Sequence, residues 1–328
     1  MSVTTVTTGI GVPAAQSTES ITTAGSGRGG RGRRGRDRRS MDRVGSSPAS
    51  RRALGVIPGV ILVLGSLYCF IPLFWLFSAA TKGRETLFTT NTFIPDGIGG
   101  FFTNVVQLTN YQGGAFWQWM GNSVIYAGGG AALSVLVSAA FGYGLAMYEF
   151  RGKQAAFGLV LVGMLLPGVV IAIPQYLLMA QLELTNTYFA ILLPVMVSPF
   201  GMWLCRVFAS SSVPRELLDA GRVDGASEFR IFSSIGLRLM APGLLTVFLL
   251  QFVGIWNNFL LPFIMLSDNT KYPLSLGLYS MMRGSDTEEA IIPTLVISGS
   301  LIATVPLIII FVWLQKYMRI NFGGGLKG

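Results

Sequence analysis

The chain has 328 residues, of which 51% are hydrophobic and only 12% are charged, and its mean hydropathy is +0.58. Ordinary soluble domains carry about 25% charged residues, so this composition excludes a water-soluble domain and predicts a protein that lives in lipid. Histidine is absent. Its absence removes the commonest general base and the commonest metal ligand. We therefore expect neither catalytic residues nor a metal site in this chain.

The net charge of +9 is concentrated near the N-terminus, because ten of the 24 Lys and Arg residues lie within residues 1–53. This segment is rich in Ser, Thr, Gly and Arg, and it lacks the apolar side chains needed to offset the entropy of folding. We predict a disordered basic cytoplasmic tail that touches anionic membrane lipid. Arg/Gly tracts also bind RNA, so the alternative is an RNA-binding tail with a membrane anchor. We do not expect nucleic acid as a partner.

Six long apolar runs follow the tail, and each exceeds the roughly 20 residues that cross a bilayer. They cover residues 54–80, 119–147, 155–181, 187–209, 242–266 and 290–315. A chain in lipid must satisfy its backbone hydrogen bonds internally, and these runs are too long for barrel strands. We therefore predict an all-α membrane protein with six transmembrane helices in a domain at 54–328. Cys69 and Cys205 lie inside these runs, where we expect them to pack as small apolar side chains.

Lys and Arg residues orient the predicted spans. If the N-terminus is cytoplasmic, 20 of the 24 basic residues lie on the inner side, and only Lys82, Arg84, Lys271 and Arg283 lie outside. Cytoplasmic loops of membrane proteins carry such an excess of basic residues. The sequence therefore predicts that both termini are cytoplasmic.

The inner loop at 213–242 is long for a connection between neighbouring helices, so we expect it to have structure and a partner of its own. Pro214 suits the first turn of a helix. Glu216 and Asp219 follow near that start, where negative charge complements the helix dipole. These residues predict a first short helix below the membrane.

A turn and a second helix are predicted to follow. Asp224-Gly225 is a turn signal, and Ser227 suits the N-cap of the second helix. That helix should carry four apolar residues towards Pro242, namely Phe229, Ile231, Phe232 and Ile235. Gly221 and Gly225 are four residues apart, so we expect a shallow notch through which the backbone of another protein could approach.

The stretch PRELLDAGRVDGAS is similar to the EAA loop of ABC importer permeases, whose pattern is Glu-Ala-Ala, three residues, Gly, nine residues, Ile, one residue, Leu-Pro. In this chain the matching positions are Asp219, Ala220, Gly221, Gly225, Ile235 and Leu237-Arg238. Three of them depart from the pattern: Asp219 replaces Glu, Gly221 replaces Ala, and Arg238 replaces Pro. The Gly weakens a helix by up to about 1 kcal/mol.

Other stretches resemble the carbohydrate-importer branch of the same family, and especially its second permease subunit. They are WQWMGNSVIYA, LTNTYFAILLP at 184–194, FVGIWNNFLLPFIML at 252–266 and the Gly-rich end that closes in LKG. The resemblance runs from the first span to the C-terminus and leaves out the basic tail. It implies a type I ABC importer permease fold in a bacterial plasma (inner) membrane.

The resemblance also implies partners. They are a second permease subunit in a heterodimer, two ATPase subunits that hold ATP and Mg, and an extracellular solute-binding lipoprotein that delivers a carbohydrate. The residues expected to couple the ATPases to transport are Glu216, Asp219, Ala220, Gly221, Asp224 and Gly225. No cofactor is expected in this chain itself. The alternative for the loop is an amphipathic surface helix without a coupling role.

The energy source can be narrowed from the residues alone. No Gly-x-x-x-x-Gly-Lys-Ser/Thr stretch is present, so the chain cannot build a P-loop for nucleotide phosphates. The competing hypothesis is an ion-coupled secondary transporter or a channel that works without ATPases. Such transporters usually place carboxylates inside the bilayer, whereas Glu149 and Glu183 fall at the borders of spans. The sequence therefore favours an import subunit, not an enzyme, that depends on partner ATPases.

The candidate translocation path is a group of polar residues in the apolar runs. Trp256, Asn257 and Asn258 are adjacent, and an aromatic face beside amides can recognise sugar rings and hydroxyls. Gln175 is a weaker candidate for the same path. The alternative is that these side chains hold helices together, because Asn and Gln form hydrogen bonds between spans.

The segment at 267–289 is predicted to lie outside the membrane. It carries Lys271 and Tyr272, and further on Arg283 and three acidic residues. We expect this segment to contact the solute-binding protein. A solvated connector is an equal alternative.

Overall fold

The computed structural model describes residues 48–283 and 292–322, and it gives side chains at 58–283 and 292–317. The predicted tail up to residue 47 lies outside these residues. Within them the regular structure is entirely helical, which confirms the predicted all-α class. The chain divides into two compact units, one that ends at Val63 and one that starts at Leu64. The functional regions all lie in the second unit.

Helix α1 (Pro48–Ala80) begins at Pro48, six residues before the apolar run that starts at Leu54. Proline suits a first helical turn, and the Ala and Arg residues that follow favour helix, which extends the helix beyond its apolar run. From Pro58 to Ala80 the helix is apolar enough to cross a membrane, and 0% of its most apolar window is buried. This apolar surface is therefore available to lipid.

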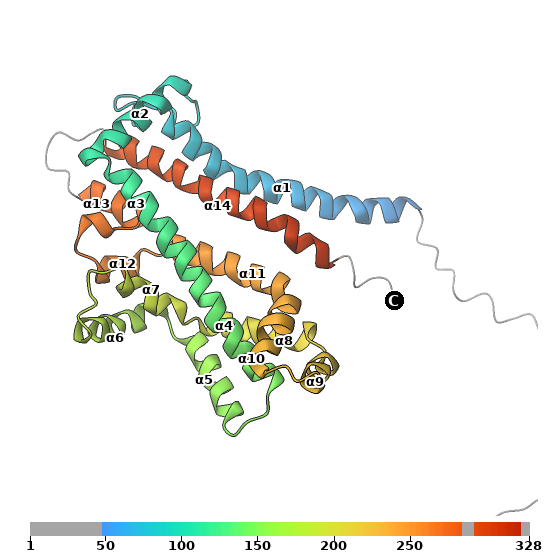
Figure 1. The fold of residues 1–328 in the computed structure, drawn as a ribbon. Helices are drawn as coiled ribbons and strands as arrows, with labels where there is room; N and C mark the ends of the chain where they lie inside the picture. Colours follow the sequence, from blue (N-terminus) through green and yellow to red (C-terminus); the bar gives the residue numbers. More distant parts are fainter. Residues whose placement is uncertain (1–47, 284–291, 323–328) are drawn as a thin grey trace, which may run out of the picture. The chain divides into compact units, whose positions relative to one another are not determined.

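The helices after α1 follow the order in Figure 1. The first group is α2 (Ile98–Asn110), η1 (Tyr111–Gly113), α3 (Ala115–Val124), η2 (Ile125–Gly129), α4 (Gly130–Met147), α5 (Lys153–Leu165), α6 (Gly168–Gln181), α7 (Phe189–Met196) and α8 (Pro199–Ser212). The second group is α9 (Arg215–Val223), α10 (Glu228–Ile231), η3 (Phe232–Gly236), α11 (Leu237–Trp256), α12 (Leu260–Met265), η4 (Asn269–Lys271), α13 (Leu274–Arg283) and α14 (Ile292–Phe322). Among these, η2 and η3 are single π-helical turns inside longer helices.

Four continuous helical stretches of the described chain can cross a membrane, at Pro58–Ala80, Ala115–Met147, Glu228–Trp256 and Ile292–Tyr317. Two more spans exist only if bent pairs are counted, α5 with α6 at 108° and α7 with α8 at 41°. The predicted runs 155–181 and 187–209 are therefore broken helices.

Prolines explain both breaks. Leu166 and Pro167 adopt extended backbone between α5 and α6, because the residue before a proline is disfavoured in the α conformation and proline cannot donate a backbone hydrogen bond. The same holds at Ser198, which precedes Pro199 and caps α8 by accepting a hydrogen bond from the Gly201 amide.

Helices α4 and α8 pack face to face through small residues. A Cβ atom on Gly142 of α4 would lie 2.6 Å from the backbone nitrogen of Arg206, and one on Gly201 of α8 would lie 2.6 Å from the Ser138 hydroxyl. Only glycine permits such an approach, which is a common device between membrane helices. The Gln251 side chain of α11 donates to the Ser198 hydroxyl and so ties a third helix to this pair.

Candidate functional site

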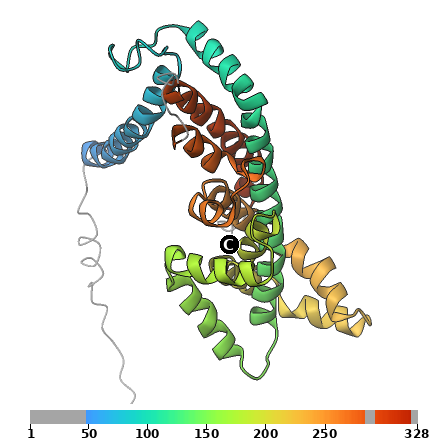
Figure 2. The same cartoon turned by 90° about the vertical axis from the view of Figure 1, so that its left-hand side faces the viewer.

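The segment 213–242 folds as the sequence predicts, into a helix, a turn and a second helix. Pro214 is the N-cap of α9, Glu216 lies in its first turn and Arg222 in its last. Ser227 is the N-cap of α10, and its hydroxyl accepts a hydrogen bond from the Arg230 amide. In Figure 2 α9 and α10 project beside the lower end of α4.

The turn after α9 depends on Gly225. This residue has a φ of 78°, which L side chains rarely adopt. The Ala226 amide donates to the Gly221 carbonyl at 3.0 Å and the Gly225 amide to the Arg222 carbonyl at 3.0 Å. These two bonds form a Schellman motif, which satisfies carbonyls at the end of the helix.

One face of α9 packs inward, and Gly221 lies on it. Leu218 and Gly221 are buried, and a Cβ on Gly221 would lie 3.2 Å from the Ile231 side chain. The expected notch at Gly221 is therefore wrong, since Ile231 of the returning helix fills it. Gly221 permits close packing of α9 on α10, while Gly225 stays exposed with no atom near its missing Cβ.

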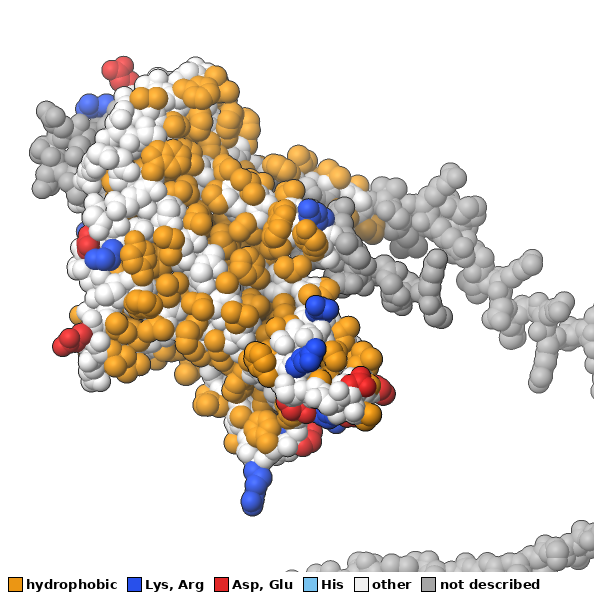
Figure 3. All heavy atoms as spheres, in the orientation of Figure 1, with side chains coloured by type: hydrophobic (Ala, Val, Ile, Leu, Met, Phe, Trp, Pro, Cys, Tyr) orange, Lys and Arg blue, Asp and Glu red, His pale blue; other side chains and the backbone are white. Residues whose placement is uncertain are grey.

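The opposite face of α9 is exposed and carries apolar side chains among its charges. The exposed candidate coupling residues are Glu216, Asp219, Ala220, Asp224 and Gly225. Val223 is 87% exposed and Phe229 77%, with Leu217 beside them at 44%. Phe229 lies on the predicted second helix, whereas no local signal in the sequence singled out Val223. In Figure 3 charged side chains gather over the end of the molecule that α9 and α10 form.

Charged side chains connect α9, α10 and the end of α4. Arg222 donates to Asp219 Oδ1 at 2.7 Å and to Glu228 Oε1 at 2.7 Å. The Tyr148 hydroxyl, just past α4, donates to Glu228 Oε2 at 2.6 Å. Burial, and then the bond to Glu228, raise the pKa of Tyr148, so the phenol keeps its proton at physiological pH.

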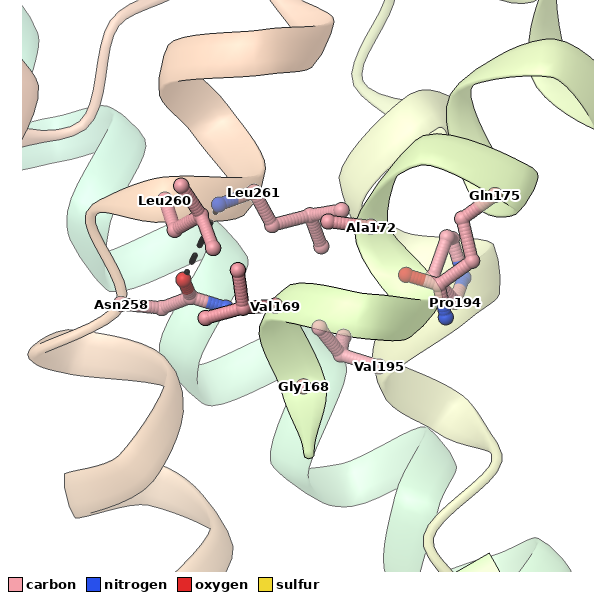
Figure 4. A pocket seen from close by; sticks show the side chains of 9 residues that line it. All are labelled: Gly168, Val169, Ala172, Gln175, Pro194, Val195, Asn258, Leu260 and Leu261. Carbon is pink, nitrogen blue, oxygen red and sulfur yellow. Dashed lines mark hydrogen bonds between the residues drawn. The ribbon is translucent and has the colours of Figure 1, made fainter. Parts of the chain in front are cut away.

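Gln175 and Asn258 line one partly open cavity of about 360 Å³. Figure 4 shows Gln175 on α6 and Asn258 on the loop after α11 at opposite sides of this cavity, whose other walls are mostly apolar. The Asn258 side-chain oxygen accepts a hydrogen bond from the Leu261 amide at 3.3 Å. The structure thus brings together two of the four predicted path residues.

Trp256 and Asn257 line a different cavity of about 240 Å³, together with Ser275, Ser300 and Thr304. Helix α11 ends at Trp256, and the Asn257 amide group donates back to the Val253 carbonyl at 2.8 Å. Because the chain turns there, Asn257 and Asn258 line different cavities. The three adjacent residues therefore do not form the single cluster expected from the sequence.

The loop 266–274 is held by side chains of α3, η2 and the 184–194 stretch. Asn122 donates to the carbonyls of Thr270 and Tyr272 at 2.8 and 3.0 Å and accepts from the Tyr188 hydroxyl at 2.8 Å. Tyr126 donates to the Lys271 carbonyl at 2.9 Å. Two of the sequence stretches that carry the family resemblance, WQWMGNSVIYA and LTNTYFAILLP, thus meet at this loop.

Further bonds fix the ends of the same loop. Asn186 has a φ of 59°, and its side-chain oxygen accepts from the amides of Ser267 and Asp268 at 3.1 and 2.9 Å. Lys271 donates to Asp268 Oδ2 at 2.6 Å, and this bond, with others from Thr270, lowers the pKa of Asp268 to about 2. Lys271 is therefore engaged inside its own loop. Residues 284–291, part of the expected contact with a binding protein, lie outside the described residues.

The comparisons with known proteins agree with this architecture. The family described as binding-protein-dependent transport system inner membrane component matches residues 135–319. The chain is 37% identical over 248 residues to the arabinooligosaccharides transport system permease protein AraQ of Halalkalibacterium halodurans, which covers 75% of this chain and 84% of that protein. It is 30% identical over 282 residues to the lactose transport system permease protein LacG of Rhizobium radiobacter. This match covers 84% of this chain and 98% of that protein.

A solved structure shares the fold. The chain superposes with a TM-score of 0.72 on a chain from the crystal structure of a bacterial ABC transporter involved in the import of the acidic polysaccharide alginate, with 23% identity over 83% of this chain and 98% of that one. At this identity the likeness describes the fold alone.

Proposed function

The chain belongs to the family of binding-protein-dependent transport system inner membrane components, and from that premise we propose that it moves a sugar or oligosaccharide inward, driven by ATPases docked on the segment 213–242. As a permease subunit it is a transport protein and not an enzyme. ATP and Mg belong to the partner ATPases in this proposal, and the chain itself carries no cofactor.

The exposed apolar face of α9 and α10 is the observation that supports ATPase docking. Val223 is 87% exposed and Phe229 77%, and the same two helices carry exposed charged residues. Protein interfaces likewise combine an apolar core with a polar rim. We assign Glu216, Asp219, Ala220 and Asp224 to this interface by their exposure. Gly221 and Gly225 act indirectly, because they shape the helix and its turn.

A carbohydrate is the proposed substrate. Relatives are named for transport of arabinooligosaccharides and of lactose, which supports this class. The cavities add amides of Gln175 and Asn258, and hydroxyls beside Trp256. We propose that Gln175 and Asn258 contact the sugar together, because they line one cavity, whereas Trp256 and Asn257 border a second one.

The remaining partners and the orientation follow from the family as proposals. They are a second permease subunit, two ATPase subunits and an extracellular solute-binding lipoprotein. Both termini are placed in the cytoplasm by the distribution of Lys and Arg, with the basic tail at the inner leaflet. The competing function is ion-coupled transport without ATPases.

The test is uptake of labelled oligosaccharide by proteoliposomes that contain the complete complex. We expect uptake with ATP and none with an ion gradient alone; the reverse result would establish the competing function. Phe229→Asp and Val223→Asp should abolish uptake by preventing ATPase docking. Phe88→Asp is the matched control, because Phe88 is 76% exposed and Phe229 77%, and it should assemble with the ATPases as the wild type does.

A further inference from the structure

The segment 213–242, here called the coupling segment, is joined to the end of α4 at both ends of α9. At its start, Arg215 lies 3.9 Å from Glu149, and Glu149 also accepts from Lys153 at 2.9 Å. At its end, Arg222 bonds to Glu228, which accepts from Tyr148 at 2.6 Å. The connection between α4 and α5 thus holds α9 at two places.

A buried layer beneath these polar bonds joins the same elements. The Tyr143 ring packs 5.0 Å from Phe232 and 5.9 Å from Tyr148, centroid to centroid. A Cβ on Gly236 would lie 2.8 Å from the Tyr143 ring, so η3 lies directly against α4. Leu218 and Ile231 belong to the same buried cluster. Because interiors are close-packed, α9 cannot move relative to α4 without breaking this layer.

Helix α4 is continuous with α3 through the π-helical turn η2. The stretch Ala115–Met147 is one helix, and its other end carries Asn122 and Tyr126, which hold the loop 266–274. A displacement of α9 therefore has a continuous helical connection to the opposite end of the molecule. Such a path explains coupling only if its joints move as rigid bodies.

We propose that Tyr148, Arg222 and Glu228 are positioning residues that make the coupling segment and the end of α4 move as one body when ATPases act on α9. This inference rests on the proposed function, since it presupposes ATPase docking. Each exposed ion pair alone contributes little. The Tyr148 hydroxyl adds a charge-assisted bond to the same Glu228 carboxylate that holds Arg222, and so it joins this ion pair to the end of α4.

The first test is Tyr148→Phe, which removes only the hydroxyl. Sugar imported per ATP hydrolysed should fall by about tenfold, the fold-change expected from losing one charge-assisted hydrogen bond, while ATP hydrolysis and ATPase binding stay as in the wild type. Tyr68→Phe on the exposed α1 is the matched control. Unchanged import per ATP in Tyr148→Phe overturns the inference, whereas a wild-type complex that imports no sugar with ATP overturns the proposed function.

The second test is cross-linking in the assembled complex. Cys69→Ser and Cys205→Ala give a background without thiols, into which Tyr148→Cys and Glu228→Cys are introduced. Import per ATP should fall in the double variant and recover when a short bifunctional thiol reagent joins the two positions. A simple packing role predicts no recovery. Import that stops on cross-linking and returns on reduction of the link shows that the two segments separate during transport, and overturns the proposal.

Discussion

The two ends of the second unit are held by different interactions. At one end, the loop 266–274 is fixed mainly by buried or half-buried amide and phenol groups that bond to backbone carbonyls, as Asn122 and Tyr126 do. At the other end, α9 and α10 rest on a buried apolar layer, and the polar bonds between them join exposed charged side chains. Val223 and Phe229 stay exposed there.

The two kinds of bond differ in how firmly they hold the chain. Bonds from side chains to backbone carbonyls specify one conformation and are barely screened by salt. Exposed ion pairs are weak and can rearrange. Exposed apolar side chains are unfavourable in water, and covering them with a partner is favourable. The loop 266–274 is therefore held in one conformation by its own bonds, whereas the segment 213–242 leaves apolar side chains uncovered, as the proposed docking of a partner requires.

The largest expected effect on stability is at Gly277, at the end of the unit that holds the loop 266–274. A Cβ there would lie 2.2 Å from the Trp119 ring, so Gly277→Val should destabilise the protein by about 3 kcal/mol or more through overpacking. Gly254→Ala is the control, because no atom lies within 4 Å of its missing Cβ. Thermal unfolding in detergent measures both. A wild-type melting temperature in Gly277→Val would contradict the packing at this end.

Asn122→Leu should have the next largest effect. It removes two bonds to the carbonyls of Thr270 and Tyr272 and leaves the Tyr188 hydroxyl without its acceptor. We expect a loss of about 2–3 kcal/mol in the free energy of unfolding, since buried groups that lose a partner are costly. Gln118→Leu replaces an exposed amide of the same helix and should change stability little. Equal effects of the two substitutions would contradict the role of Asn122 in holding the loop 266–274.

A smaller effect is expected at Gly225, in the turn after α9. Because its φ is 78°, Gly225→Ala should strain the turn by about 1 kcal/mol, which lowers import per ATP without preventing membrane insertion. Gly225→Asn should be tolerated better, since Asn enters this conformation more readily. Uptake and ATP hydrolysis of the two variants provide the comparison, and a larger loss with Asn than with Ala would argue against a backbone cause.

The smallest effect is that of pH on the loop 266–274. The pKa of Asp268 is lowered to about 2, from an ordinary value of about 3.9. A lowered pKa stabilises the fold above the ordinary value, and that stabilisation is lost as the pH falls through about 2. The difference in melting temperature between wild type and Asp268→Asn should therefore stay constant from pH 5 to 8. A difference that changes within that range would contradict this assignment.

Local signals made part of the structure predictable from the sequence. Pro214, Asp224-Gly225 and Ser227 act through their own backbone, so the helix, turn and second helix could be placed within a residue or two. The inward position of Gly221 depends on Ile231, which returns from the next helix, and no local rule contains that contact.

The interior was less predictable for the same reason. Several prolines stand in the apolar runs, but only those at Pro167 and Pro199 coincide with bends between helices, whereas Pro174 and Pro194 remain inside α6 and α7. Neighbouring helices decide which proline breaks a span. The division of Trp256, Asn257 and Asn258 between two cavities likewise follows from where α11 ends.

The uninterrupted helix Ala115–Met147 has a consequence for the membrane around it. Its 33 residues measure about 50 Å at 1.5 Å each, whereas the hydrocarbon core of a bilayer is about 30 Å thick. A helix that is longer than the hydrocarbon core tilts further when the bilayer becomes thinner. Asn122 lies near one end of this helix and Tyr148 just beyond the other. We therefore expect a change in lipid chain length to reorient both contacts together, so that transport depends on the thickness of the bilayer.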